Sequence, residues 1–244
     1  MRLNVVLTVM IISLLGIAGC ASGSMNRTPD ELLGLTVSGL SGVDHYTFKG
    51  TTKIAIGDGT VIKPISFQGE VRNHEQLEVK SSDSDSAADL IHPLELLKEI
   101  EQSAASTELI AAESDKATAV LQIKTDEKAA ARLWAGRLRS QFKQLQSSIP
   151  GTEVSPLQQQ DESQASAQFK KEWDAELARS GRLLEEMLAT LHVSSTYKLQ
   201  LDRSKMLPLR LQEHTVLRYK TQGQQRQETR SSDVSFPSLA QRRK

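Results

Sequence analysis

Alternation of apolar and polar residues is the pattern that most constrains the fold of this chain. Between residues 45 and 56, apolar or β-branched side chains recur at alternate positions, with polar and charged ones between them. A period of two predicts a strand with one buried and one wet face, which is typical of antiparallel sheets. The expected buried face comprises Tyr46, Phe48, Thr52, Ile54 and Ile56, and the wet face comprises His45, Thr47, Lys49, Thr51 and Lys53.

The same period returns further along the chain, and segments rich in Gly, Asn, Asp and Ser separate its occurrences. The sequence therefore predicts about eight strands, grouped as an N-terminal meander, a central hairpin and a C-terminal set. After the first strand, the others are expected over residues 65–72, 77–80, 109–113, 118–125, 196–201, 209–219 and 226–236.

Helices are expected between these groups of strands. Apolar residues spaced by three and four predict them, and Thr28-Pro29-Asp30-Glu31 has the residue types of a helix start. An alternating strand buries one face only, so the helices must cover that face. We therefore expect an α+β fold in which a curved antiparallel sheet of about eight strands carries helices on its concave side. The expected helices lie near residues 29–39, 93–100, 126–146 and 167–191.

The alternative is a two-domain α+β chain that divides at Thr152, where a Gln-, Ser- and Asp-rich segment begins. The C-terminal strands can complete the sheet that begins near Tyr46, which favours one domain over residues 29–236. Residues 237–244 end in Gln-Arg-Arg-Lys and are expected to form a disordered basic tail.

The N-terminus predicts export and attachment to a membrane. Arg2 precedes an apolar stretch of eleven residues, 5–15, which is shorter than the roughly 20 residues that span a bilayer. Ile17-Ala18-Gly19-Cys20 resembles the bacterial lipobox, which implies a signal peptide over 1–19 and a lipid-anchored tether over 20–28. Cys20 would carry a diacylglycerol, with or without an N-acyl chain, because stable anchoring needs more than one chain. The host membrane would be the cell membrane of a Gram-positive cell or the outer membrane of a Gram-negative one.

Charge and cysteine content exclude several other functions. The 30 basic and 30 acidic residues balance, whereas a general nucleic-acid binder needs a basic excess, so we expect no nucleic-acid partner. A single Cys excludes an intrachain disulfide framework and any metal or redox site of the CxxC type. We also expect no other cofactor and no metal site.

The order of elements resembles the LolA-like lipoprotein-carrier family and its Gram-positive lipoprotein relatives. The likeness rests on the leading helix, the strand Tyr46-Thr47-Phe48-Lys49-Gly50-Thr51, the strand Phe67-Gln68-Gly69-Glu70-Val71, and the C-terminal segment Tyr197-Lys198-Leu199-Gln200-Leu201-Asp202 with Leu207-Pro208. The resemblance implies an incomplete antiparallel barrel, closed by helices, whose apolar concavity can hold acyl chains. A tether at Cys20 departs from the soluble carriers, because it would prevent long-range transport.

These observations predict a non-enzymatic, membrane-anchored lipoprotein with a lipid or other apolar ligand in its half-barrel. The alternative is an envelope scaffold that uses the same fold to bind a protein partner, for example in cell-wall or sporulation machinery. No catalytic motif stands in a convincing context: Ser140-Gln141-Phe142-Lys143 matches SxxK without its companion motifs. The candidate ligand-lining residues are Tyr46, Phe48, Ile54, Phe67, Trp134, Phe142, Trp173 and Tyr197; each could equally be plain core.

Overall fold

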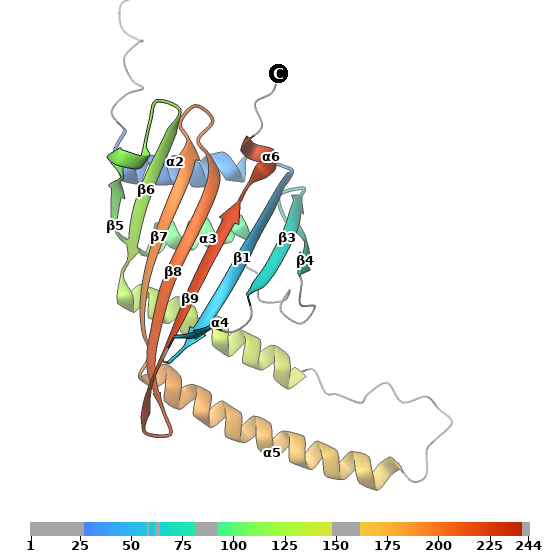
Figure 1. Cartoon of the computed structure of the whole chain (residues 1–244). Coiled ribbons are helices and arrows are strands. Elements are labelled where there is room, and N and C mark those ends of the chain that lie inside the picture. Colours follow the sequence, from blue (N-terminus) through green and yellow to red (C-terminus); the bar gives the residue numbers. More distant parts are fainter. Residues whose placement is uncertain (1–26, 58, 62–63, 82–91, 148–161, 241–244) are drawn as a thin grey trace, which may run out of the picture.

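The computed structural model describes residues 27–57, 59–61, 64–81, 92–147 and 162–240, and its centre is one curved antiparallel sheet (Figure 1). The strand order is β4-β3-β1-β9-β8-β7-β6-β5, with the short β2 paired to β1, and the sheet does not close into a barrel. The strands are β1 (Tyr46–Ile56), β2 (Thr60–Val61), β3 (Ile65–Arg72), β4 (Gln76–Ser81), β5 (Ala104–Leu109), β6 (Thr118–Thr125), β7 (His192–Asp202), β8 (Leu207–Thr221) and β9 (Gln224–Ser235).

The first and last strands of the chain are neighbours in the middle of this sheet. In the β1–β9 pair, Gly50 lies opposite Val234 and Ile54 lies opposite Arg230. Towards the β5 edge of the sheet, β6 pairs with β7, and Ile123 lies opposite Tyr197. The three strands that follow residue 152, β7, β8 and β9, therefore lie between two groups of strands that precede it, within one sheet.

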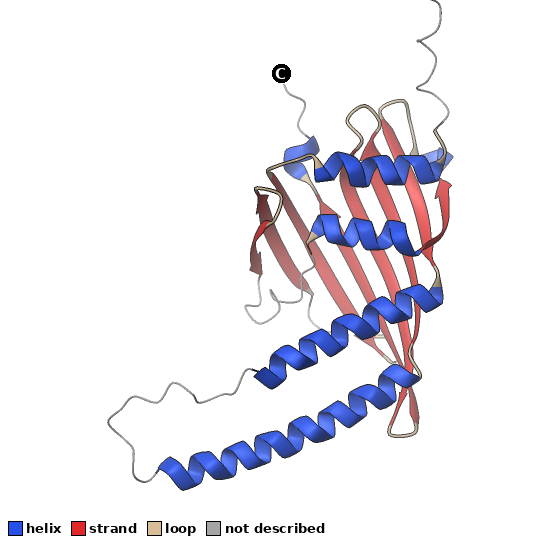
Figure 2. Ribbon diagram, turned by 180° about the vertical axis from the view of Figure 1, so that it is seen from behind, coloured by secondary structure: helices blue, strands red, loops and turns tan. Residues whose placement is uncertain are grey.

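Helices cover the concave face of the sheet (Figure 2). Three helices, α2, α3 and α4, cross that face one below the other, and α5 leaves the lower end of the sheet next to the β8–β9 hairpin. The expected fold class is thus confirmed. The helices are α2 (Pro29–Ser41), α3 (Pro93–Ser103), α4 (Glu127–Ser147), α5 (Glu162–Ala189) and the short α6 (Pro237–Ala240), with a 3₁₀ turn at Ala111–Glu113.

Local sequence sets where these helices begin. Thr28 accepts a hydrogen bond from the backbone N–H of Glu31 (3.2 Å), and the Glu31 carboxylate accepts one from the backbone of Thr28 (2.8 Å). This capping box satisfies two N–H groups that have no partner within the helix. His92 Nδ1 caps α3 through Leu94 N (3.2 Å), and Asp126 Oδ1 caps α4 through Ala129 N (2.7 Å).

The main core lies between the upper sheet and the helices α2 and α3. Its most buried side chains include Leu33 and Leu40 of α2, Leu97 and Ile100 of α3, and the inward residues of β6 and β7. A separate small cluster beneath α4 contains Ala130, Leu191, Val193 and Leu217. The helix α4 is therefore held by fewer buried apolar side chains than α2 or α3.

Three predicted segments differ from the structure. The edge strand β5 occupies residues 104–109 rather than 109–113, because the expected strand residues 111–113 form the 3₁₀ turn. The tail expected from residue 237 begins as helix α6, whose Leu239 is buried against the main core. A ninth, two-residue strand, β2, pairs with the end of β1. Cys20, with the rest of residues 1–26, lies outside the described residues, as does most of the Gln-rich segment after Thr152.

Candidate ligand site under the helices of the half-barrel

A small cavity lies between the concave face of the sheet and the helices α3 and α4. Its volume is about 40 Å³, which is room for roughly three water molecules. Most of its wall is apolar, but one part carries charged side chains from three different elements. The lining residues are Phe48, Thr52, Phe67, Pro93, Leu96, Arg137, Leu211, Glu213, Arg230, Ser232, Val234 and Phe236.

Two phenylalanines that face glycines form the β1–β3 side of the cavity. Phe48 lies opposite Gly69, and Phe67 lies opposite Gly50, in the register of these two strands. Each ring leans over the glycine of the neighbouring strand, into space that any side chain there would fill. The two rings are tilted by 59°, with their centroids 6.3 Å apart. The glycines thus let large aromatic rings lie close to the sheet and leave the cavity free above them.

The charged cluster, defined as Glu99, Arg137, Glu213 and Arg230, forms the other part of the site. Glu213 on β8 is 8 % exposed, and its Oε2 lies 3.6 Å from Arg230 Nε on β9. Arg137 on α4 forms an ion pair with Glu99 on α3. Burial of charges is unfavourable unless they are paired, and here two cations and two anions balance. The cluster ties α3, α4 and the sheet together.

Both arginines of the cluster lie over the ring system of Trp134 on α4. The Cζ atoms of Arg137 and Arg230 are 5.8 and 5.7 Å from the centroid of its ring system. At this range the electron-rich face of an indole attracts a guanidinium group. Trp134 therefore holds together two like charges that come from a helix and from a strand.

Hydroxyl groups extend this polar region along the sheet. Thr215 donates a hydrogen bond to Glu213 Oε1 (2.8 Å), and its oxygen lies 2.9 Å from Ser195 Oγ. Ser232 Oγ accepts a long hydrogen bond from Arg230 Nε (3.5 Å) and lies 3.0 Å from Thr52 Oγ1. A stripe of polar side chains thus crosses the inward face of β7, β8, β9 and β1.

Burial changes the acid–base behaviour of two groups here. Desolvation, together with the nearby carboxylate of Glu213, raises the pKa of Tyr197 to about 12, so its phenol stays neutral. Desolvation also lowers the pKa of Arg137, and repulsion from Arg230 acts in the same direction. Both shifts indicate an interior that is poorly solvated.

The structure brings together five of the eight candidate ligand-lining residues predicted from the sequence. Phe48 and Phe67 line the cavity itself. Trp134 and Tyr197 line a second space of about 10 Å³ next to it, which shares Leu96 and Arg137 with the cavity. Tyr46 packs higher in the core, against Phe236, which lines the cavity.

The other three candidates lie away from the cavity. Ile54 shares the inward face of β1 but is not part of the cavity wall. Phe142 on α4 packs against α5 near Gly181, since a Cβ at that glycine would meet its ring at 3.2 Å. Trp173 stacks on Phe169 along α5, with centroids 6.4 Å apart. The stripe containing Phe142 thus serves a helix–helix contact, and Trp173 pairs with a neighbour on its own helix.

Sequence reasoning missed Glu213 and Arg230. The signal was present in the alternation: the inward positions of β8 include Leu211, Glu213, Thr215 and Leu217, so an acid and a hydroxyl interrupt an apolar series. An ionisable residue at an inward strand position requires a partner inside the fold. That partner, Arg230, holds the inward position on β9 that lies opposite Thr215, so it reaches Glu213 diagonally across the strand pair.

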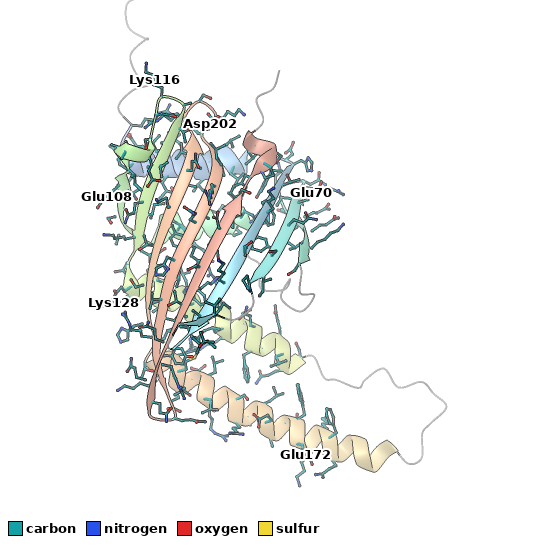
Figure 3. The ribbon with its side chains drawn as sticks, in the orientation of Figure 1. Glu70, Glu108, Lys116, Lys128, Glu172 and Asp202 are labelled. Atoms are coloured by element: carbon teal, nitrogen blue, oxygen red, sulfur yellow. The ribbon has the colours of Figure 1, made fainter. Side chains whose placement is uncertain are left out.

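Charged side chains elsewhere lie mostly on the outer surface (Figure 3). Asp202 and Lys116 mark the upper end of the sheet, whereas Glu172 lies on α5 at the opposite end. Within the described ranges, His, Cys, Asp and Glu side chains do not gather into a group of three or more that could hold a metal ion. The helices of these ranges also include none with the length and apolar character needed to cross a membrane.

Comparison with known proteins gives no family for this chain: neither protein-family models nor curated proteins match it.

Proposed function

We propose that this chain is a non-enzymatic, lipid-anchored extracytoplasmic lipoprotein whose half-barrel binds a lipid or another apolar ligand. The observation that carries the proposal is the cavity of about 40 Å³ beneath α4, bounded by Phe48, Phe67 and Phe236. An apolar space between a curved sheet and a loosely packed helix is a site where a chain can be inserted.

The cavity is too small for a whole acyl chain as it stands. Ligand pockets usually measure about 300–1,000 Å³. A larger space requires a helix to move, and among the three helices that cover the sheet α4 is held least firmly, because Ala130 is its one buried residue. The helices α2 and α3, in contrast, bury Leu33, Leu40, Leu97 and Ile100 in the main core. Segments with few buried apolar contacts open most readily, so α4 would act as the cover of the site.

Ligand binding can be tested on residues 21–244, which include every described element but not Cys20. A fluorescent fatty acid is titrated into this protein, and lipid extracted from the purified protein is identified by mass spectrometry. Leu96→Phe should block the cavity and weaken binding of the probe at least tenfold. Leu35→Phe makes the same exchange on the exposed side of α2, where Leu35 is 37 % accessible, and should bind normally. Absence of both co-purified lipid and probe binding in the unsubstituted protein would refute this function.

Anchoring rests on Ile17-Ala18-Gly19-Cys20 and is tested separately. In the full chain, Cys20→Ala should abolish labelling with radioactive palmitate and release the protein from the membrane fraction. Retention in membranes after this change would mean that the N-terminal apolar segment spans the bilayer, contrary to the proposal.

The second candidate, an envelope interaction protein, is favoured by the arm, defined as α5 with residues 138–147 of α4. The arm extends beyond the sheet at the end opposite to Asp202 and α2 (Figure 3). It exposes apolar side chains, since Phe169 is 47 % and Leu145 is 46 % accessible. A protein partner would bury them.

A photo-crosslinking amino acid that replaces Phe169 should capture the same protein partner in intact cells each time the experiment is repeated. The matched control places the crosslinker at Lys53, which is exposed on the convex face of β1. Equal crosslinking from both positions, or none from Phe169, would remove the basis for this candidate.

A further inference from the structure

Two arginine side chains lie close together inside the half-barrel, although a purely apolar ligand would not require a positive charge there. Arg137 reaches in from α4 and Arg230 from β9, and both lie over the one ring of Trp134 at under 6 Å. Their side chains are only 25 % and 23 % accessible. Bringing two guanidinium groups together in a poorly solvated interior is unfavourable unless anionic groups lie close to both.

The two internal carboxylates satisfy these arginines unequally. Glu99 pairs directly with Arg137 from the α3 side. Glu213 accepts a hydrogen bond of ordinary length, 2.8 Å, from Thr215 with one oxygen, whereas its other oxygen is 3.6 Å from Arg230 Nε. The contact of that nitrogen with Ser232 is also long, at 3.5 Å. Normal hydrogen bonds to an arginine measure about 2.7–3.2 Å, so Arg230 has capacity for a closer anionic partner.

The position of this arginine pair relative to the cavity indicates what such a partner would look like. Arg137 and Arg230 line the same cavity as Phe48, Phe67 and Val234. One molecule entering there would meet guanidinium groups at one end and an apolar wall along the rest. The present cavity, with room for about three waters, would take a compact head group, and a longer chain would follow along the wall as α4 moves.

We infer that Arg137 and Arg230 form a subsite for the compact anionic head group of an amphiphile, such as a carboxylate or phosphate joined to an apolar chain. This inference rests on the proposed function and specifies the class of its ligand. Arginine suits the role because its planar fork can donate two parallel hydrogen bonds to one such head group. Glu213 is the internal anion that the head group displaces from Arg230.

The test uses residues 21–244 and four probes below their micellar concentrations: decanoate, decyl phosphate, decanol and inorganic phosphate. Isothermal titration should show that one or both of the charged amphiphiles bind at least tenfold tighter than decanol, which has the same chain without the charge. Charge-assisted hydrogen bonds are strong enough for a difference of this size. Inorganic phosphate should bind weakly, because it cannot use the apolar wall.

Two variants should change affinity for the charged amphiphile in opposite directions. Arg230→Gln should weaken it about tenfold or more and leave decanol unchanged. Glu213→Gln should strengthen it several-fold, because it removes the competing internal carboxylate and keeps an acceptor for Thr215. If Arg230 and Glu213 had only a structural role, their substitutions would not change the affinity for the charged amphiphile in opposite directions. Arg210→Gln is the matched control, since Arg210 pairs with Asp233 on the convex face of the same sheet.

The folding of each variant is checked by circular dichroism. If Arg230→Gln does not fold, Arg230→Lys replaces it. The lysine keeps the positive charge but should lose part of the preference for the charged amphiphiles over decanol. Equal binding of decanoate, decyl phosphate and decanol would overturn the head-group subsite and leave the apolar-ligand function standing. Binding of none of the amphiphiles would overturn both. Inorganic phosphate bound as tightly as the amphiphiles would mean a free-anion site and would also overturn the inference.

Discussion

Phe48 on β1 lies directly across from Gly69 on β3, and its ring occupies the place that a side chain at position 69 would take. A Cβ there would come within 2.7 Å of Phe48 Cε1 and 3.0 Å of the Glu78 carbonyl oxygen. Gly69→Ala should therefore push the ring off its position and lower the free energy of unfolding by about 1–3 kcal/mol. Chemical denaturation followed by circular dichroism measures this difference.

Gly136→Ala is the matched control for that substitution. Gly136 lies in the middle of α4, and a Cβ there would meet no atom within 4 Å. The same exchange should stabilise the protein by about 0.5–1 kcal/mol, because alanine favours a helix interior over glycine. Equal effects at both positions would show that the aromatic–glycine contact does not restrict position 69.

The three tyrosines should resist ionisation in the folded protein. Burial is the largest cause of a raised pKa at all three, and it brings the pKa of Tyr197 and of Tyr219 to about 12. A tyrosine in the unfolded chain ionises near pH 10. The unfolded state therefore releases protons that the folded state keeps, and stability should fall as the pH rises from about 10 to 12.

Absorbance at 295 nm during an alkaline titration tests this directly. The phenolate signal should rise in one steep step together with the loss of structure. A separate, reversible step near pH 10 with about one third of the amplitude would contradict the assignment for one tyrosine, and Tyr219→Phe would identify the half-buried one.

Substituting one member of the Glu213–Arg230 ion pair should lower the free energy of unfolding strongly, whereas substituting both members by apolar residues should lower it little. Glu213→Leu leaves Arg230 without its nearest carboxylate and should destabilise the protein by about 3–5 kcal/mol. The double variant with Glu213→Leu and Arg230→Met should recover most of that loss, since an apolar pair of similar size avoids the desolvation penalty. A double-mutant cycle from urea unfolding measures the coupling, and additive single effects would argue against a direct interaction.

The helix α5 should be the first described element to open. Its described side chains are half-exposed or exposed, whereas β7 alternates buried residues such as Val193 and Leu199 with wetter ones. In hydrogen-exchange mass spectrometry, amides of α5 should exchange well before those of β7. Phe142→Ala removes the ring that packs near Gly181 and should speed exchange in α5 further, with little change in β7. Equal protection of the two elements would mean that α5 is held by contacts beyond these.

Alternation predicted most of the sheet because each central strand has one buried face. The prediction misplaced β5, whose residues Ala-Ala-Ser-Thr-Glu-Leu include one large apolar side chain, Leu109. An edge strand pairs on one side only, so its sequence is under weaker constraint. Of the apolar residues that favoured the strand assignment, Leu109 ends β5, whereas Ile110 leads into the 3₁₀ turn.

The candidate site was predictable on its apolar side only. Phe48 and Phe67 follow from strand periodicity, but the charged cluster depends on which inward positions of β8, β9 and α4 meet in space. Glu213 and Arg230 are 17 residues apart in the sequence, and the register of the β8–β9 hairpin decides whether they meet. The sequence gives little information about that register. The same limit explains why Phe142 and Trp173 were wrongly expected to line the cavity. A helical stripe indicates that one face of a helix is apolar, but it does not indicate which element packs against that face.

The place of β9 between β1 and β8 has a consequence for how the chain folds. Thr52 and Ser232, whose hydroxyls lie 3.0 Å apart, are separated by 180 residues, so the central pairing joins segments that are synthesised far apart in time. Closing so long a loop is slow, and until it happens the meander of β1, β3 and β4 has an unpaired edge. During synthesis, the unpaired edge of β1 must therefore be kept from aggregating until β9 has been made.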